Sequence, residues 1–127
     1  MAKEWVTVCA MDTAGLADMA LQGRRIADRN GLSLRIVLFQ QKTYSLIETA
    51  HRLEYAYRCA VRADACMEVF YVSDDSQIKK QMQRDTRWLI WDKRESQGLC
   101  LKQYCIDQTD HGCSSVMMLE QPRRKAI

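Results

Sequence analysis

The chain opens with a short apolar segment that ends on an acidic residue and runs into an amphipathic helix. Residues 6–11 are apolar and rich in β-branched side chains, and Asp12 follows them directly. An apolar stripe at helical spacing begins at Leu16. A strand that stops just before a helix is the first half of a β–α–β unit, and in open α/β sheets ligands bind at the carboxyl ends of strands. We therefore expect Asp12 to lie where a ligand could be bound.

The same alternation of strand and helix continues to the end of the chain. The apolar patterns predict strands at 6–11, 33–39, 67–72, 88–91 and 116–119, and helices at 16–30, 44–62, 75–85 and 99–108. Strict alternation implies a parallel sheet with helices on both faces and right-handed crossovers. We expect a three-layer α/β/α sandwich with a five-stranded sheet in the order 3-2-1-4-5.

The ends and faces of the first two helices can also be predicted. Thr13 is suited to cap the start of the first helix, and Asn30-Gly31 to end it, since both tolerate the left-handed conformation. In the second helix, one side carries most of the larger apolar residues. That side consists of Leu46, Ile47, Ala50, Leu53, Glu54, Tyr57 and Val61.

Length and charge limit what kind of protein this is. The 127 residues suit one domain over the whole chain, with a flexible tail at 121–127, and the 47% hydrophobic share is enough for a core. A net charge of +3 is too balanced for a nucleic-acid-binding surface. No apolar run is long enough to cross a bilayer and no signal peptide is evident, so we expect a cytoplasmic protein without membrane insertion.

The six cysteines are expected to pack in the core rather than to bind metal or take part in redox reactions. They are Cys9, Cys59, Cys66, Cys100, Cys105 and Cys113. No pair has the C-x-x-C spacing of zinc or thioredoxin-like sites. Free cysteine behaves as a small buried hydrophobe, so we expect core positions and no bound metal.

In this order the residues resemble the universal stress protein family, and most closely the degenerate version found in Kdp-type sensor histidine kinases. The resemblance covers roughly residues 6–119. It is carried by the first strand ending on Asp12, the small-residue helix closed by Gly31, the stretch 51–75, the strand and loop 87–94, and the closing segment 112–119.

This resemblance implies a Rossmann-like, adenine nucleotide alpha hydrolase-like fold that pairs through its last strand. In ATP-binding members the Asp that ends the first strand binds the adenine, and a Gly-rich loop after the fourth strand binds the phosphates. Asp12 matches the first element. Residues 92–98 hold a single glycine and several charged side chains, and only residues without a Cβ let backbone N–H groups line a tight anion site. We therefore expect the usual ATP phosphate loop to be degenerate.

Two interpretations stay open for the candidate site. Asp12, with Thr13 and Phe39, could line an adenine site, with Lys93 and Arg94 holding an anion. Alternatively, Asp12 accepts hydrogen bonds at the start of the first helix, and Lys93 and Arg94 lie in a solvated loop. Acidic and hydroxyl residues at 73–75 suit helix capping.

The function that we predict is a non-catalytic regulatory or sensor domain. It would act by forming a homodimer through the edge strand 116–119 or by docking on a protein partner, and it would require no cofactor. The alternative is a module of the same fold that binds ATP, AMP or cyclic di-AMP. Catalysis has no support, because neither His51 nor His111 belongs to a recognisable nucleophile motif.

Overall fold

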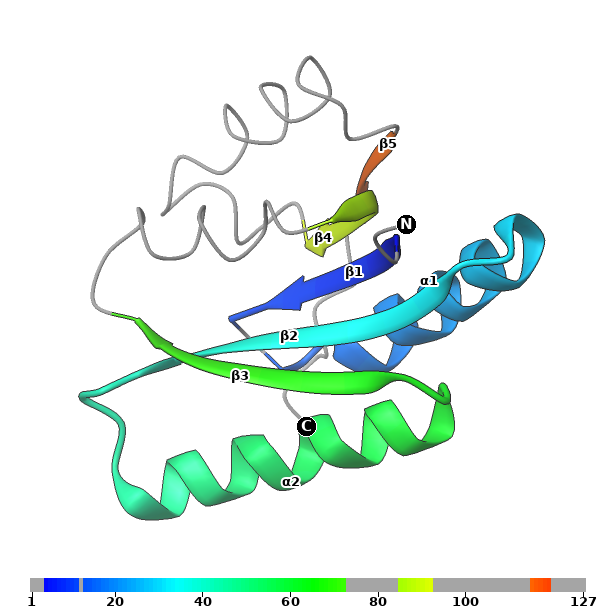
Figure 1. Cartoon of the computed structure of the whole chain (residues 1–127). Helices are drawn as coiled ribbons and strands as arrows, with labels where there is room; N and C mark the ends of the chain where they lie inside the picture. Colours follow the sequence, from blue (N-terminus) through cyan, green and yellow to red (C-terminus); the bar gives the residue numbers. More distant parts are fainter. Residues whose placement is uncertain (1–3, 12, 73–84, 93–114, 120–127) are drawn as a thin grey trace.

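The computed structural model describes residues 4–11, 13–72, 85–92 and 115–119. Within them the chain forms five strands and two helices (Figure 1). These elements are β1 (Trp5–Ala10), α1 (Leu16–Asn30), β2 (Ser33–Gln41), α2 (Leu46–Arg62), β3 (Cys66–Val72), β4 (Thr86–Asp92) and β5 (Ser115–Leu119). The helices predicted at 75–85 and 99–108, the acidic segment 73–75 and the tail 121–127 lie outside the described residues.

The five strands form one parallel sheet in the order β3-β2-β1-β4-β5. The central strand β1 lies between β2 and β4, so that Val8 is opposite both Ile36 and Ile90. The predicted parallel sheet and its strand order are confirmed. Each predicted strand appears within two residues of its expected ends.

Both described helices cover the same face of the sheet (Figure 1). The chain moves outward from β1 to β2 to β3, and two right-handed crossovers in one direction place their helices on one side. Alternate strand residues therefore pack against α1 and α2. The fully buried members of this face are Val6, Val8, Ala10, Leu34, Ile36, Leu38 and Ile90.

Helix α1 approaches the sheet closely at Gly23. A Cβ at this position would lie 2.7 Å from Cδ1 of Leu34 and 3.0 Å from Cγ2 of Val8. The glycine thus lets the helix backbone approach β1 and β2 directly. The helix ends at Gly31 in the left-handed conformation, with φ of 64°, which confirms the predicted end.

The predicted cap of α1 is wrong. The residue before the first turn is Gly15, which has no side chain to accept a hydrogen bond, and Thr13 contributes only its backbone carbonyl, which accepts from the N–H of Leu16. Helix α2, by contrast, begins after Ser45, whose hydroxyl accepts from the N–H of Glu48 at 3.1 Å. Its start at Leu46 lies two residues after the predicted one.

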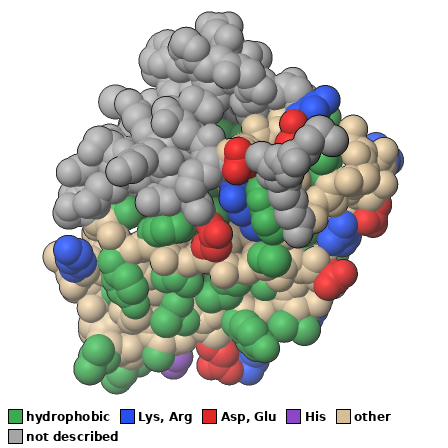
Figure 2. All heavy atoms as spheres, viewed as in Figure 1, with side chains coloured by type: hydrophobic (Ala, Val, Ile, Leu, Met, Phe, Trp, Pro, Cys, Tyr) green, Lys and Arg blue, Asp and Glu red, His purple; other side chains and the backbone are tan. Residues whose placement is uncertain are grey.

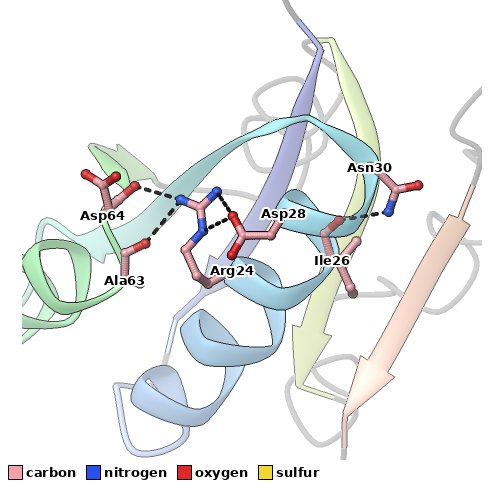
Figure 3. A network of polar contacts seen from close by, with 6 residues as sticks. All are labelled: Arg24, Ile26, Asp28, Asn30, Ala63 and Asp64. Atoms are coloured by element: carbon pink, nitrogen blue, oxygen red, sulfur yellow. Dashed lines mark hydrogen bonds and ion pairs between the residues drawn. The ribbon is translucent and has the colours of Figure 1, made fainter.

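Arg24 joins the two helices near their carboxyl ends (Figure 3). Its guanidinium donates to the carbonyls of Ala63 and Asp64, just after α2, at 3.3 Å and 3.0 Å. An ion pair of 2.9 Å with Asp28, one turn further along α1, holds the arginine in place. Asn30 caps the same end of α1 by donating to the carbonyl of Ile26 at 2.8 Å. These contacts fix α1 against the turn between α2 and β3.

The opposite face of the sheet contains a buried polar cluster. Arg35 on β2 is only 3% exposed. Its Nε donates to the hydroxyl of Thr7 at 2.8 Å, and its Nη2 to the hydroxyl of Thr86 at 3.1 Å. The guanidinium carbon also lies 5.2 Å from the ring centroid of Trp5. A buried guanidinium is stable only when its donors are satisfied, so these contacts join β2 to β1 and β4.

The fully buried residues of α2 are small, and most of its large apolar residues are exposed. Its buried residues are Ala56, Cys59 and Ala60. The side on which the sequence gathers its larger apolar residues mostly faces solvent, with Leu46 90% and Ile47 71% exposed, while Leu53 on that side is half-buried against the core. Small side chains let the helix backbone lie close to β2 and β3, so the smaller residues form the packed side.

The prediction of buried cysteines is confirmed at two positions and wrong at one. Cys9 and Cys59 are buried, whereas Cys66 is exposed at the start of β3. β3 is an edge strand and its first residue follows a turn, so Cys66 has a neighbouring strand on one side only. The three remaining cysteines lie outside the described residues.

Candidate functional site

The carboxyl ends of β1 and β2 meet the first half of α2, at the edge of the sheet where ligands bind in this architecture. Met11 follows the last residue of β1, and Phe39 and Gln40 lie near the end of β2. Arg52, in the second turn of α2, extends toward all three. We call this group, with Tyr44, the strand-end cluster.

The guanidinium of Arg52 joins the three elements by hydrogen bonds. Nη2 donates to the backbone carbonyls of Met11 and Phe39, the latter at 3.1 Å. Nε donates to the side-chain oxygen of Gln40. The half-buried ring of Tyr44 lies against the guanidinium, with 4.8 Å between the ring centroid and the guanidinium carbon. A cation in this geometry gains from both the ring and the carbonyl dipoles.

Gln40 completes the cluster from inside the sheet. Its side chain has no exposed surface, and its amide Nε2 donates to the backbone carbonyl of Thr49 in α2 at 3.4 Å. Its amide thus accepts from Arg52 and donates to the helix backbone. Because a buried amide is costly unless both ends are bonded, Gln40 and Arg52 depend on each other.

The structure places only part of the predicted site. Thr13 is half-buried just after β1, close in sequence to the strand-end cluster. Phe39 has no exposed surface, and its ring packs 6.4 Å from the ring of Phe70 on β3. Its side chain therefore fills the sheet face, while its backbone carbonyl belongs to the cluster. Asp12, Lys93 and Arg94 lie outside the described residues.

Sequence reasoning missed Gln40, Tyr44 and Arg52. One signal could have found Arg52: it lies four residues before Ala56, on the side of α2 that carries the small buried residues. An arginine on the packed side of a helix needs acceptors, and the nearest carbonyls are those at the ends of neighbouring strands. That inference requires knowing which side of α2 packs against the sheet. The larger apolar residues indicated the other side.

Two kinds of reactive group can be assessed over the described residues, metal-binding clusters and nucleophilic cysteines. Over the ranges given above, no group of three or more His, Cys, Asp or Glu side chains could hold a metal ion. Burial raises the pKa of the Cys59 thiol, although a hydrogen bond from Tyr55 and the charge of Arg62 act in the opposite direction. Since a reactive cysteine needs a lowered pKa, Cys59 is unsuited to act as a nucleophile. His51 is exposed on α2.

Neither of the two described helices has an apolar stretch long enough to span a membrane.

Comparisons with known proteins identify the fold. No family model and no curated protein matches the sequence. Among solved structures, the chain is similar to a universal stress protein from Archaeoglobus fulgidus in complex with dAMP, with a TM-score of 0.60 and 12% identity over 94% of this chain and 98% of that one. It is also similar to a universal stress protein in complex with cAMP, with a TM-score of 0.62 and 15% identity over 96% of this chain and 100% of that one.

A third structure, of an Archaeoglobus fulgidus universal stress protein, gives a TM-score of 0.58 at 13% identity, over 94% of this chain and all of that one. The chain therefore has the parallel α/β fold of these universal stress proteins. Identities this low establish the fold alone.

Proposed function

We propose that this chain is a non-catalytic regulatory domain of the universal stress protein fold, which acts through protein contacts and not through ATP. The observation that carries the proposal is the strand-end cluster. In open α/β sheets a ligand is bound outside the carboxyl ends of the strands, where the strand order reverses, which is here between β1 and β4, and the cluster borders this crevice at the end of β1. Here Arg52 of the chain itself bonds the carbonyls of Met11 and Phe39 at that edge.

The cluster disfavours a bound adenine for a simple reason. An adenine amino group needs an acceptor, and the strand-end carbonyls are natural candidates. Arg52 already donates to two of them with a charge-assisted bond, which is stronger than a neutral one. Because each carbonyl oxygen has a second lone pair, an adenine amino group would have to share these acceptors with the positively charged guanidinium or displace it.

The sequence of the segment after β4 supports the same conclusion. Residues 92–98 contain one glycine, Gly98, and four charged side chains. A triphosphate cradle needs backbone N–H groups that converge on the anion, which side chains on most positions obstruct. A degenerate phosphate loop of this kind accords with the version in Kdp-type sensor kinases, and that subtype forms part of the proposal.

Protein contact is then the remaining way for the domain to act. Among the described strands, the edge strand β5 (Ser115–Leu119) pairs with β4 alone, and an apolar edge strand invites pairing with another chain. The proposal therefore includes a homodimer through residues 116–119 or docking of a partner protein there.

A second candidate is an adenine-mononucleotide-binding module of the same fold. The observation that favours it is that two proteins with this fold are in complex with dAMP and cAMP. Each ligand has a single phosphate, so it needs no triphosphate cradle. Asp12, Thr13, Lys93 and Arg94 would then contact the nucleotide, and Arg52 would supply positive charge beside it.

Isothermal titration calorimetry separates the two candidates. We expect ATP, AMP, cAMP and cyclic di-AMP to give no binding heat with the wild-type protein at millimolar concentration. Binding in the micromolar range that disappears in Asp12→Ala would instead establish the nucleotide-binding function. Thr43→Ala, an exposed substitution in the loop before α2, is the matched control for nonspecific change.

A further inference from the structure

The acceptors of the strand-end cluster converge on one flat group. The backbone carbonyls of Met11 and Phe39 accept from Nη2 of Arg52, and the side-chain oxygen of Gln40 accepts from Nε. The guanidinium carbon lies over the ring of Tyr44, 4.8 Å from the ring centroid. The cluster therefore binds a planar group in two ways, through N–H donors in its plane and against an aromatic ring.

We propose that Arg52 is the internal occupant of a site for an aromatic ring that carries an amino group, and that its guanidinium closes this site in the wild-type protein. An aminated ring, like a guanidinium, is flat, has N–H donors in its plane and stacks on aromatic side chains. This inference rests on the proposed function, in which the strand-end cluster disfavours a bound nucleotide. It assigns that effect to one autoinhibitory side chain, whose removal admits the ligand.

The acceptors are held in place by the fold and not by Arg52 alone. Two of them are main-chain carbonyls at the ends of neighbouring parallel strands, Met11 directly after β1 and Phe39 within β2. The third belongs to Gln40, which has no exposed surface and donates from Nε2 to the carbonyl of Thr49 at 3.4 Å. Truncation of Arg52 therefore leaves a space with three acceptors beside it.

The space that the guanidinium fills can be reached from solvent, because the side chain of Arg52 is only half-buried. Within the described part of the chain, Nη1 donates to no protein group, and the guanidinium is held through Nε and Nη2. The group that closes the site is thus bonded on its inner side to the acceptors that a ligand would use.

These acceptors also discriminate between similar rings. Adenosine carries an amino group at the position where inosine carries a carbonyl oxygen. The amino group donates to a strand-end carbonyl, whereas the oxygen of inosine would face the carbonyls of Met11 and Phe39 with no hydrogen between them. A site built to bond an N–H group strongly rejects an analogue that lacks it. The pair of nucleosides therefore tests the chemistry of the site.

Isothermal titration calorimetry of Arg52→Ala with the two nucleosides is the experiment. We expect this variant to bind adenosine at least about tenfold more tightly than the wild type does, and about tenfold more tightly than it binds inosine, since one hydrogen bond can supply such a factor. Nucleosides carry no phosphate, so the result does not depend on residues 92–98. Arg58→Ala, at an exposed arginine of the same helix, is the matched control and should bind neither nucleoside.

A second control addresses binding elsewhere, because apolar side chains gather on the surface over β3 and α2 and could hold an aromatic ring without specificity (Figure 2). In the Arg52→Ala background, Tyr44→Ala removes the ring on which the ligand stacks and should weaken adenosine binding by about tenfold. Tyr57→Ala removes a ring of the same size that is 62% exposed on α2. It should leave the affinity unchanged.

Loss of stability in Arg52→Ala does not hide the result. Since a ligand that binds only the folded state raises the unfolding midpoint, adenosine should raise the midpoint of this variant and inosine should not. Arg52→Gln, which keeps part of the side chain, is the second variant and should behave in the same way if the alanine variant does not fold.

Arg52 variants that bind adenosine no better than the wild type, or that bind adenosine and inosine equally, would overturn the inference and leave the proposed function standing. Nucleotide binding by the wild type would contradict the proposed function instead. In that case, a further tenfold gain in Arg52→Ala would still support the inference, and equal affinities in the two proteins would overturn it.

Discussion

Arg52 in the second turn of α2 donates a hydrogen bond to the backbone carbonyl of Met11, immediately after β1. This contact crosses 41 residues of sequence and joins the central strand to a helix that packs mainly over β2 and β3. It also places a cation of the protein at the edge of the sheet where ligands of this fold are bound. The contribution of this contact to the free energy of unfolding can be measured directly.

Replacing Arg52 by methionine should lower the free energy of unfolding by about 2–3 kcal/mol, because it removes the guanidinium that donates to the carbonyl of Phe39 and to the buried amide oxygen of Gln40. Urea denaturation of the variant measures the change. Arg58→Met is the control on the same helix, since its ion pair with Glu54 is exposed and should contribute about 0.5 kcal/mol or less. Equal losses in the two variants would show that the strand-end cluster has no special role.

The buried polar cluster on the other face should be equally sensitive. Thr7→Val keeps the shape of the side chain but removes the hydroxyl that accepts from Nε of Arg35 at 2.8 Å. Since Arg35 is only 3% exposed, water cannot replace the lost acceptor, and we expect a loss of about 1–3 kcal/mol in thermal or urea unfolding. The same substitution at exposed Thr43 should have no measurable effect.

Gly23→Ala tests the close approach of α1 to the sheet. A new Cβ would lie 2.7 Å from Cδ1 of Leu34, a buried side chain in a packed layer. The clash should outweigh the helix-propensity gain of about 1 kcal/mol, for a net loss of about 1–2 kcal/mol. Leu34→Val removes the contacting methyl, so the double variant should lose less than the sum of the single losses. Additive losses would contradict the geometry.

Cys59 gives stability a dependence on pH. Burial raises the pKa of its thiol above the ordinary value of 9.0, so above pH 9.0 the unfolded chain loses this proton more readily than the folded one. The folded state then binds more protons, and stability falls as pH rises through this range; below pH 9.0 the contribution is fully present. Unfolding midpoints from pH 8 upward should therefore fall more steeply for the wild type than for Cys59→Ala.

The sequence predicted the sheet well because its signals are local and strong. Each strand is an apolar run between polar turns, as in residues 33–39, and a parallel sheet follows from strict alternation. The end of α1 at Gly31 was predictable for the same reason, since glycine takes the left-handed conformation without strain.

The packed side of α2 was not predictable from hydrophobicity. The side chains of Ala56, Cys59 and Ala60 have less apolar surface than those of Ile47 or Tyr57. They are nevertheless the residues of α2 that are buried against the sheet. The rotation of α2 is set by how closely its backbone can approach the sheet. This closeness depends on the neighbouring strands, which the sequence of the helix does not describe. The candidate site was missed for the same reason, because Arg52 marks the edge of the sheet only when this orientation is known.

The state of Arg52 in solution tests the central claim most directly. The Nε–H group of Arg52 should give a separate, slowly exchanging signal in ¹⁵N nuclear magnetic resonance, because it is bonded to buried Gln40. We predict that this signal stays unchanged when AMP or ATP is added at millimolar concentration. A signal that exchanges with water as fast as those of exposed arginines, or that shifts on addition of micromolar nucleotide, would contradict a strand-end edge held by the protein's own side chain.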